Sequence, residues 1–190
     1  MARKRRIKLS DELKDAIAGL PEKEKNKLLL RLIPKDDILV ERLTYELLEE
    51  SDSPEERRHD LREEIESYLQ RSISQFYSPG YLLLDLRSIS GSINRHLRVT
   101  KDKYGEIELN LFMLNYSLDR LAGQLRRFGH QKSKTLDVYI VKRAQKLEKL
   151  IDKLHVDYQL DFSDDYQKLI QHIDTLPNTR RMARLLEFYY

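Results

Sequence analysis

Apolar residues recur with a helical period along most of the chain. The most regular run lies between residues 107 and 128, where steps of four and three residues alternate. Such spacing places side chains on one face of an α-helix. The positions of this run are Ile107, Leu111, Leu114, Leu118, Leu121, Leu125 and Phe128. With similar runs on either side, the pattern predicts long helices over residues 54 to 77, 79 to 99, 106 to 128 and 134 to 157.

Capping residues support these boundaries. The segment from Ser53 to Glu56 combines a capping serine, a proline at the first helical position and the glutamate of a capping box. Gly129 is expected to end one long helix and Ser133 to cap the next. Because the connecting loops are short, we expect neighbouring long helices to pack antiparallel.

Shorter helical pairs flank the long helices. In residues 10 to 50, Ser10, Pro21 and either Asp36 or Asp37 each start a short apolar run, and residues 160 to 190 contain a closing pair. The sequence therefore predicts one all-α domain over residues 1 to 190. It would comprise a flexible basic arm (1 to 9), an N-terminal helical subdomain (10 to 50), a long-helix core (54 to 157) and a C-terminal pair. An irregular HEAT-like helical solenoid is the alternative, although no repeat of fixed period is found.

Residues 95 to 111 allow a second interpretation. Leu97 and Val99 precede a turn-like segment ending at Gly105, and apolar and polar residues alternate afterwards, with Ile107, Leu109 and Leu111 as the apolar positions. This pattern is also compatible with a β-hairpin. The helical interpretation is favoured because the four-and-three spacing continues to Phe128.

Composition narrows the functional classes. The chain has 190 residues, 35% of them charged, with 6 Gly, 5 Pro and no Cys. The absence of Cys excludes disulfides, thiolate metal sites and a cysteine nucleophile. No apolar run approaches the ~20 residues that span a bilayer, and the basic start lacks a signal-peptide pattern. We therefore expect a cytoplasmic protein without membrane contact.

Two pairs of glutamates form the one pattern in the sequence that is typical of an enzyme's metal site. Glu46 and Glu49, and likewise Glu63 and Glu66, lie one helical turn apart. The spacing resembles that of all-α nucleotide pyrophosphohydrolases, which gather Mg²⁺ with carboxylates. The family's partner motif, with Glu and Asp on a later helix, is not found, so a solvated charged surface is favoured. These residues are weak metal candidates, no catalytic residue is assigned and no cofactor is expected.

Basic residues form a second candidate site. At 100° per residue, four lysines fall on one face of the helix predicted over residues 134 to 157, opposite its apolar face. They are Lys142, Lys146, Lys149 and Lys153. The preceding turn could extend this strip through Arg126, Arg127, Lys132 and Lys134, and the N-terminus adds Arg3, Lys4, Arg5 and Arg6. Such a strip could meet phosphates or an acidic protein.

These patterns favour a non-catalytic helical interaction or scaffold protein whose partner is another protein or a second copy of itself. Nucleic-acid binding through the lysine face and the basic N-terminus is one alternative. Metal-dependent nucleotide hydrolysis at the paired glutamates is another.

Overall fold

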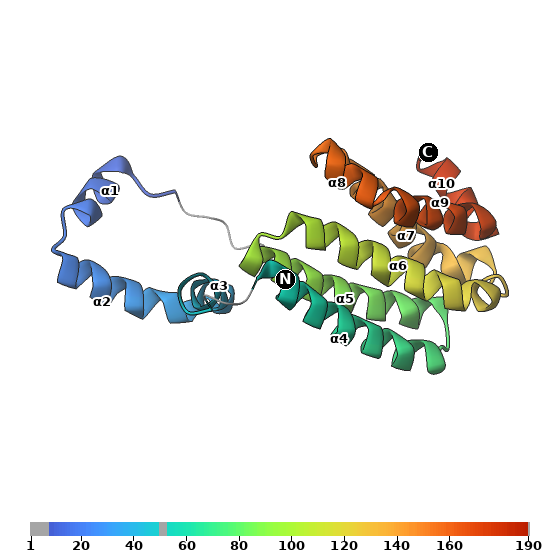
Figure 1. The fold of residues 1–190 in the computed structure, drawn as a ribbon, viewed down its shortest axis with the longest axis horizontal. Coiled ribbons are helices and arrows are strands. Elements are labelled where there is room, and N and C mark those ends of the chain that lie inside the picture. Colours follow the sequence, from blue (N-terminus) through green and yellow to red (C-terminus); the bar gives the residue numbers. More distant parts are fainter. Residues whose placement is uncertain (1–7, 50–52, 190) are drawn as a thin grey trace.

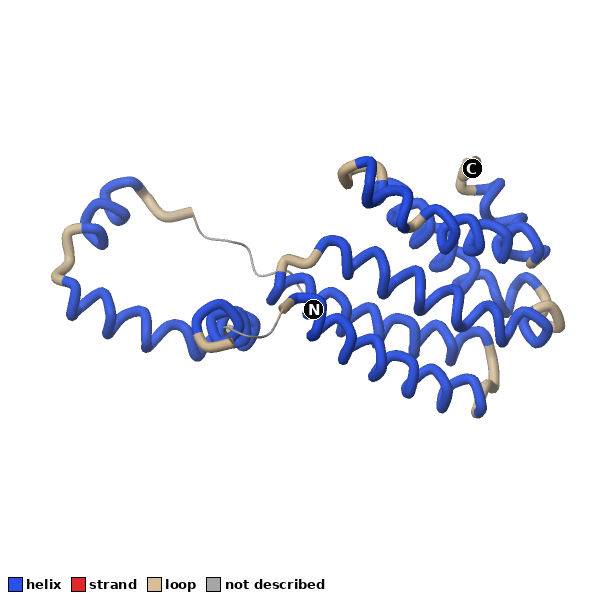
Figure 2. The backbone as a smooth tube through the Cα atoms, viewed as in Figure 1, coloured by secondary structure: helices blue, strands red, loops and turns tan. Residues whose placement is uncertain are grey.

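The computed structural model describes residues 8 to 49 and 53 to 189, and in these ranges the chain forms helices and no strand (Figures 1 and 2). The all-α prediction is confirmed. Residues 95 to 111 belong to two helices and the turn between them, so the hairpin alternative is wrong. None of the described helices combines the length and the apolar character needed to cross a membrane.

Four long helices account for most of the packed core. They are α4 (Pro54–Ser74), α5 (Pro79–Thr100), α6 (Lys103–Leu125) and α7 (His130–Ile151). The short elements before them are α1 (Asp11–Ala18), α2 (Glu22–Leu32), η1 (Ile33–Lys35) and α3 (Asp37–Leu47). The chain closes with α8 (Val156–Asp161), α9 (Ser163–Thr175) and α10 (Pro177–Leu185).

Some predicted helix ends are correct and others are not. The Ser53 side chain accepts from the Glu56 N–H, and the Glu56 side chain accepts from the Ser53 N–H, which completes the predicted capping box. The α7 start was predicted wrongly. Gly129 is the N-cap of α7, whereas Ser133 lies inside the helix and donates to a carboxylate of the next turn.

Helix α6 occupies the centre of the core, where it contacts α4, α5, α7 and α9. In addition to the predicted apolar seam, Leu109, Met113 and Tyr116 are buried on its other sides. A helix that is enclosed by other helices needs apolar side chains on all of its faces, not only on one. The sequence therefore predicted the seam but not the extent to which α6 is enclosed.

Three buried polar side chains of α6 donate hydrogen bonds to backbone carbonyl oxygens. The Asn110 amide donates to the Glu106 carbonyl oxygen (2.6 Å), and the Ser117 hydroxyl donates to that of Met113 (2.7 Å). The Asn115 amide instead reaches the Asp165 carbonyl oxygen on α9 (2.8 Å). Because a buried polar group without a partner is costly, these bonds offset part of the cost of burying the three side chains. The Oδ1 atoms of Asn110 and Asn115 have no hydrogen-bond partner within the described residues.

The C-terminal helix is held to α7 by a buried carboxylate. Asp137 accepts from the Ser133 hydroxyl (2.7 Å) and from the Thr179 hydroxyl at the start of α10 (3.1 Å). Burial raises the pKa of Asp137, and the two hydroxyl bonds oppose that rise. After α10, Phe188 is buried and Tyr189 is exposed, so part of the aromatic C-terminus belongs to the core.

The seam can be tested at Leu118, which is only 1% exposed in the middle of α6. We expect Leu118→Ala to lower the free energy of unfolding by about 2 to 5 kcal/mol, because it removes buried methyl groups and leaves a cavity. Leu84→Ala on α5 is the matched control, since Leu84 is 60% exposed and surface changes usually cost less than about 0.5 kcal/mol. Urea unfolding measures both, and equal losses would contradict the packing described.

Candidate interaction surfaces

The N-terminal helices lack a core of their own. We call residues 9 to 48 the helical extension; it lies beside the packed helices, with α1 and α2 farthest from them (Figure 1). None of the residues of α1, α2 or α3 is buried. Nine large apolar side chains of the extension are instead exposed by 38% to 77%. They are Leu9, Leu13, Leu29, Leu30, Leu32, Leu39, Val40, Leu47 and Leu48.

An arginine on α5 holds the extension to the rest of the molecule. Helix α3 packs against α5, and Arg95 donates from Nε to Glu41 (2.8 Å) and from Nη1 to Asp37 (3.0 Å). The hydrogen bonds with Glu41 and Asp37 raise the pKa of Arg95, and the bond from Arg95 lowers the pKa of Asp37. Helix α1, by contrast, makes no extensive packing contact with any described element.

A polar cluster that the sequence patterns did not predict joins α4, α5 and α6. Arg58 pairs with Asp102 (Nη1 to Oδ2, 3.1 Å) and with Glu108 (Nε to Oε2, 3.0 Å). Asp102 also lies 3.4 Å from His96 Nε2, and its Oδ1 accepts from the Gly105 N–H (2.8 Å). A Cβ atom at Gly105 would collide with the side chains of Asp102 and Arg58, so any larger residue there would displace this ion pair. The available signal was Asp102 as an N-cap three residues before Gly105.

The cluster is a structural ion-pair network whose central carboxylate is kept charged. Burial alone would raise the pKa of Asp102, but the bonds from His96 and Gly105 and the charge of Arg58 lower it below its ordinary value. A lowered carboxylate pKa means that the folded state stabilises the ionised form. The cluster therefore fixes the start of α6 against α4.

The paired glutamates each have a partner outside the pair. Glu46 binds Arg42 (2.6 Å), Glu49 binds Arg57 (2.9 Å) and Glu63 lies 3.3 Å from His59. Glu66 accepts from the amide of Gln70 (3.4 Å). Within the described ranges, no three His, Asp or Glu side chains are arranged to hold a metal ion. The geometry thus gives the hydrolase alternative no support.

The predicted lysine face is only partly realised. Lys142, Lys146 and Lys149 are exposed on α7, but Lys146 pairs with Glu106 of α6 (2.5 Å). Lys153 lies beyond the end of α7 at Ile151, because that helix ends earlier than predicted. The strip on α7 is therefore shorter than expected.

Cations of the preceding turn diverge from that strip. Arg126 donates to the Thr175 carbonyl oxygen (3.3 Å), and Lys134 is exposed on α7. Arg127 and Lys132 line a separate open cleft of about 840 Å³ beside the aromatic residues Phe76, Tyr77 and Phe128. Arg3, Lys4, Arg5 and Arg6 lie outside the described residues.

Comparison of the chain with protein-family models, with curated proteins and with solved structures gives no match.

The clamp between α5 and the extension can be tested with Arg95→Gln. Removing the charge breaks both ion pairs with α3, so we expect roughly several-fold faster amide hydrogen exchange in α3, because local opening becomes easier. Exchange in α6 should not change. Arg98→Gln is the control, since Arg98 lies on the same helix and forms no ion pair within the described residues. Equal exchange in the two variants would show that Arg95 does not hold the extension.

The polar cluster has a defined pH dependence. Because the pKa of Asp102 is lowered from 3.8, its stabilisation is present above that value and is lost as the pH falls through the folded-state pKa. We expect Asp102→Asn to lower the free energy of unfolding at neutral pH by about 1 to 3 kcal/mol. The deficit should shrink in strong acid, where wild-type Asp102 is also neutral.

Urea unfolding over a pH series measures this difference. Asp60→Asn, an exposed neutral replacement on α4, is the control and should change stability by less than about 0.5 kcal/mol at every pH. A constant deficit for Asp102→Asn at all pH values would exclude the proposed role of its charge.

Proposed function

We propose that this chain is a non-catalytic helical scaffold protein, which assembles with a second copy through the helical extension and presents the charged faces of its long helices. The observation that supports the proposal is the complete lack of buried residues in α1, α2 and α3, although these helices carry large apolar side chains. An apolar surface of this extent on a folded protein usually marks an interaction site.

Helix stability gives a reason for a partner. Helices α1 and α2 contain 8 and 11 residues. Isolated helices shorter than about 12 to 15 residues are marginal in water, and most helices in proteins depend on burying an apolar face. A partner that covers Leu13 and Leu32, exposed by 46% and 45%, would supply that burial.

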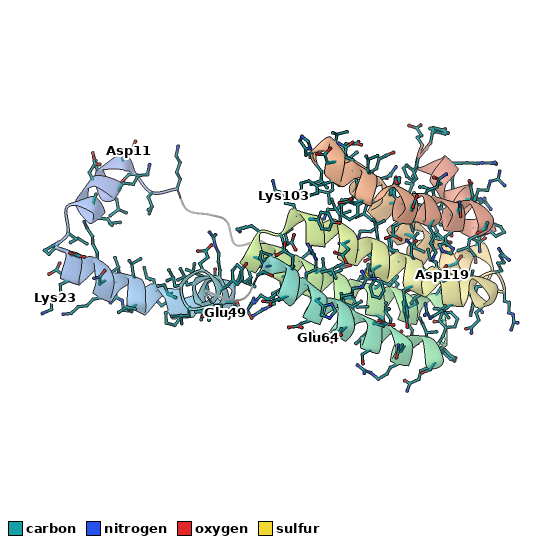
Figure 3. The ribbon with its side chains drawn as sticks, in the orientation of Figure 1. Asp11, Lys23, Glu49, Glu64, Lys103 and Asp119 are labelled. Atoms are coloured by element: carbon teal, nitrogen blue, oxygen red, sulfur yellow. The ribbon has the colours of Figure 1, made fainter. Side chains whose placement is uncertain are left out.

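Charge favours a second copy as the partner. Helix α1 carries three acids and one lysine, a net charge of −2, whereas α2 carries four cations and two glutamates, a net charge of +2. Asp11 and Lys23 lie on these separate helices in Figure 3. In a dimer with a two-fold axis, α1 of each copy could pack against α2 of the other. Helices of opposite net charge would then meet at two symmetric contacts.

The size of the extension is also sufficient. A typical stable interface buries about 800 Å² per partner and uses roughly 20 to 30 residues on each side. Helices α1, α2 and α3 contain 8, 11 and 11 residues, of which α3 is partly covered by α5. The exposed remainder would reach this size when paired with its equivalent.

The proposal is tested first by removing apolar contacts. Wild-type chain should sediment as a dimer, and Leu13→Asp with Leu32→Asp should weaken dimerisation by at least about tenfold, or ~1.4 kcal/mol, because charges would enter the interface. Thermal unfolding of the long helices should be unchanged. The control is Leu160→Asp, since Leu160 is 71% exposed on α8, outside the extension.

A charge exchange then tests the pairing of α1 with α2. Glu12→Lys with Asp15→Lys makes α1 net positive, and Lys23→Glu with Lys27→Glu makes α2 net negative. Each double variant alone should be monomeric, and an equimolar mixture should restore a dimer, because both contacts then unite opposite charges. A monomeric wild type, or a mixture that stays monomeric, would reject a second copy as the partner.

A further inference from the structure

Helices α5 and α7 lie side by side and run in the same direction. Tyr139 of α7 bonds Leu86 (hydroxyl to carbonyl oxygen, 3.2 Å) and Ser90 (hydroxyl to hydroxyl, 2.6 Å). One turn later, Arg143 Nη2 donates to the Ser90 hydroxyl (3.2 Å). Residue numbers thus increase together along both helices, and the surface beside this contact is continuous from α5 to α7.

Cations line both sides of this contact. On α5, Arg87 and Arg98 are 11 residues apart, which places them within about 20° of the same face and ~16 Å apart. On α7, Lys142, Lys146 and Lys149 share a face by the same arithmetic. We call the following residues the basic face: Arg87, Arg98, Lys142, Arg143, Lys146 and Lys149.

Acidic groups are placed elsewhere on these two helices. Asp85 of α5 accepts from Tyr68 and Ser72 of α4, and Asp137 of α7 is buried against α10. Glu106 of α6 neutralises Lys146, but within the described residues Arg98 and Lys149 form no ion pair. Apart from Lys146, the cations of the basic face form no ion pair within the described residues, so the face retains positive charge.

From this geometry we infer that the basic face binds the phosphate backbone of duplex nucleic acid, an activity separate from the proposed self-association. Two rows of cations suit a polyanion, because each contact releases condensed counterions. Single-strand binding would need open aromatic rings for base stacking. The aromatic residue at this contact, Tyr139, has its hydroxyl bonded, and the guanidinium carbon of Arg143 lies over its ring, 5.2 Å from the ring centroid.

This arrangement favours contacts to phosphates without reading of base sequence. Helices α5 and α7 present side chains on a broad helical surface, and contacts to phosphates position a protein on the duplex but carry no sequence information directly. We therefore expect similar affinity for duplexes of different sequence.

The test uses the full chain and a fluorescent 20-base-pair duplex, with anisotropy measured over a salt series. On duplex DNA, the slope of log affinity against log salt is about −0.9 for each phosphate neutralised. The variant Arg98→Gln, Lys142→Gln, Lys149→Gln should lower the magnitude of that slope by roughly 2 to 3 and weaken binding at low salt by at least about tenfold.

A matched variant separates local contacts from net charge. Arg71→Gln, Lys134→Gln, Arg181→Gln removes the same charge from exposed positions on α4, α7 and α10 that lie outside the basic face. This control should retain nearly all of the wild-type slope. Equal slopes in the two triple variants would overturn the assignment, as would the absence of duplex binding at ~50 mM salt.

A third arm examines a different anionic surface. Vesicles of phosphatidylcholine with phosphatidylserine should not compete with the duplex when lipid phosphate equals nucleic-acid phosphate. The proposal would be rejected if the wild type bound these vesicles but no duplex, and if the triple variant Arg98→Gln, Lys142→Gln, Lys149→Gln lost the vesicle binding. The basic face would then be assigned to lipid. If the same triple variant sediments like the wild type, assembly through the helical extension is unaffected. The two proposals can therefore fail separately.

Discussion

Burial of α6 is the constraint on which the rest of the molecule depends. This helix is enclosed by α4, α5, α7 and α9, so each neighbour must offer it an apolar face. Polar contacts hold α6 at its start, through Asp102, and in its middle, through Asn115 to α9. Since tightly packed interiors respond to the loss of even one methylene, stability is concentrated in this part of the chain.

Local sequence patterns predicted much of this arrangement. The capping box at Ser53 and the seam containing Leu118 depend on residues close in sequence, which is why both were correct. The burial of Asn115 and the start of α7 depend on tertiary packing. Asn115 is buried because its amide donates to a carbonyl oxygen of α9, and Ser133, predicted as a cap, lies inside α7 with its hydroxyl bonded to Asp137. Tertiary packing also shortens the predicted lysine face. Glu106 pairs with Lys146, and α7 ends before Lys153.

The helical extension, unlike α6, is not stabilised by burial. Its helices carry apolar residues in amphipathic positions but bury none, and exposed ion pairs from Arg95 attach α3 to α5. Exposed ion pairs contribute little to stability and weaken with salt. The extension can therefore change its contacts without disturbing α6. In this molecule the buried core around α6 and the exposed apolar extension are separate, an arrangement that fits the proposed scaffold role.

Helix α5 connects the two proposed activities. Arg95, which holds α3, and Arg98, which belongs to the basic face, are separated by less than one helical turn. Pairing of two extensions would therefore link two basic faces within one assembly. A second face that engages the same duplex binds at the effective concentration set by that linkage, which raises avidity without any new contact. Conversely, by thermodynamic linkage, a duplex long enough to hold both faces would favour the dimer to the same degree. Salt would oppose this coupling twice, because it screens the pairing of α1 with α2 and also reduces the counterion release on the duplex.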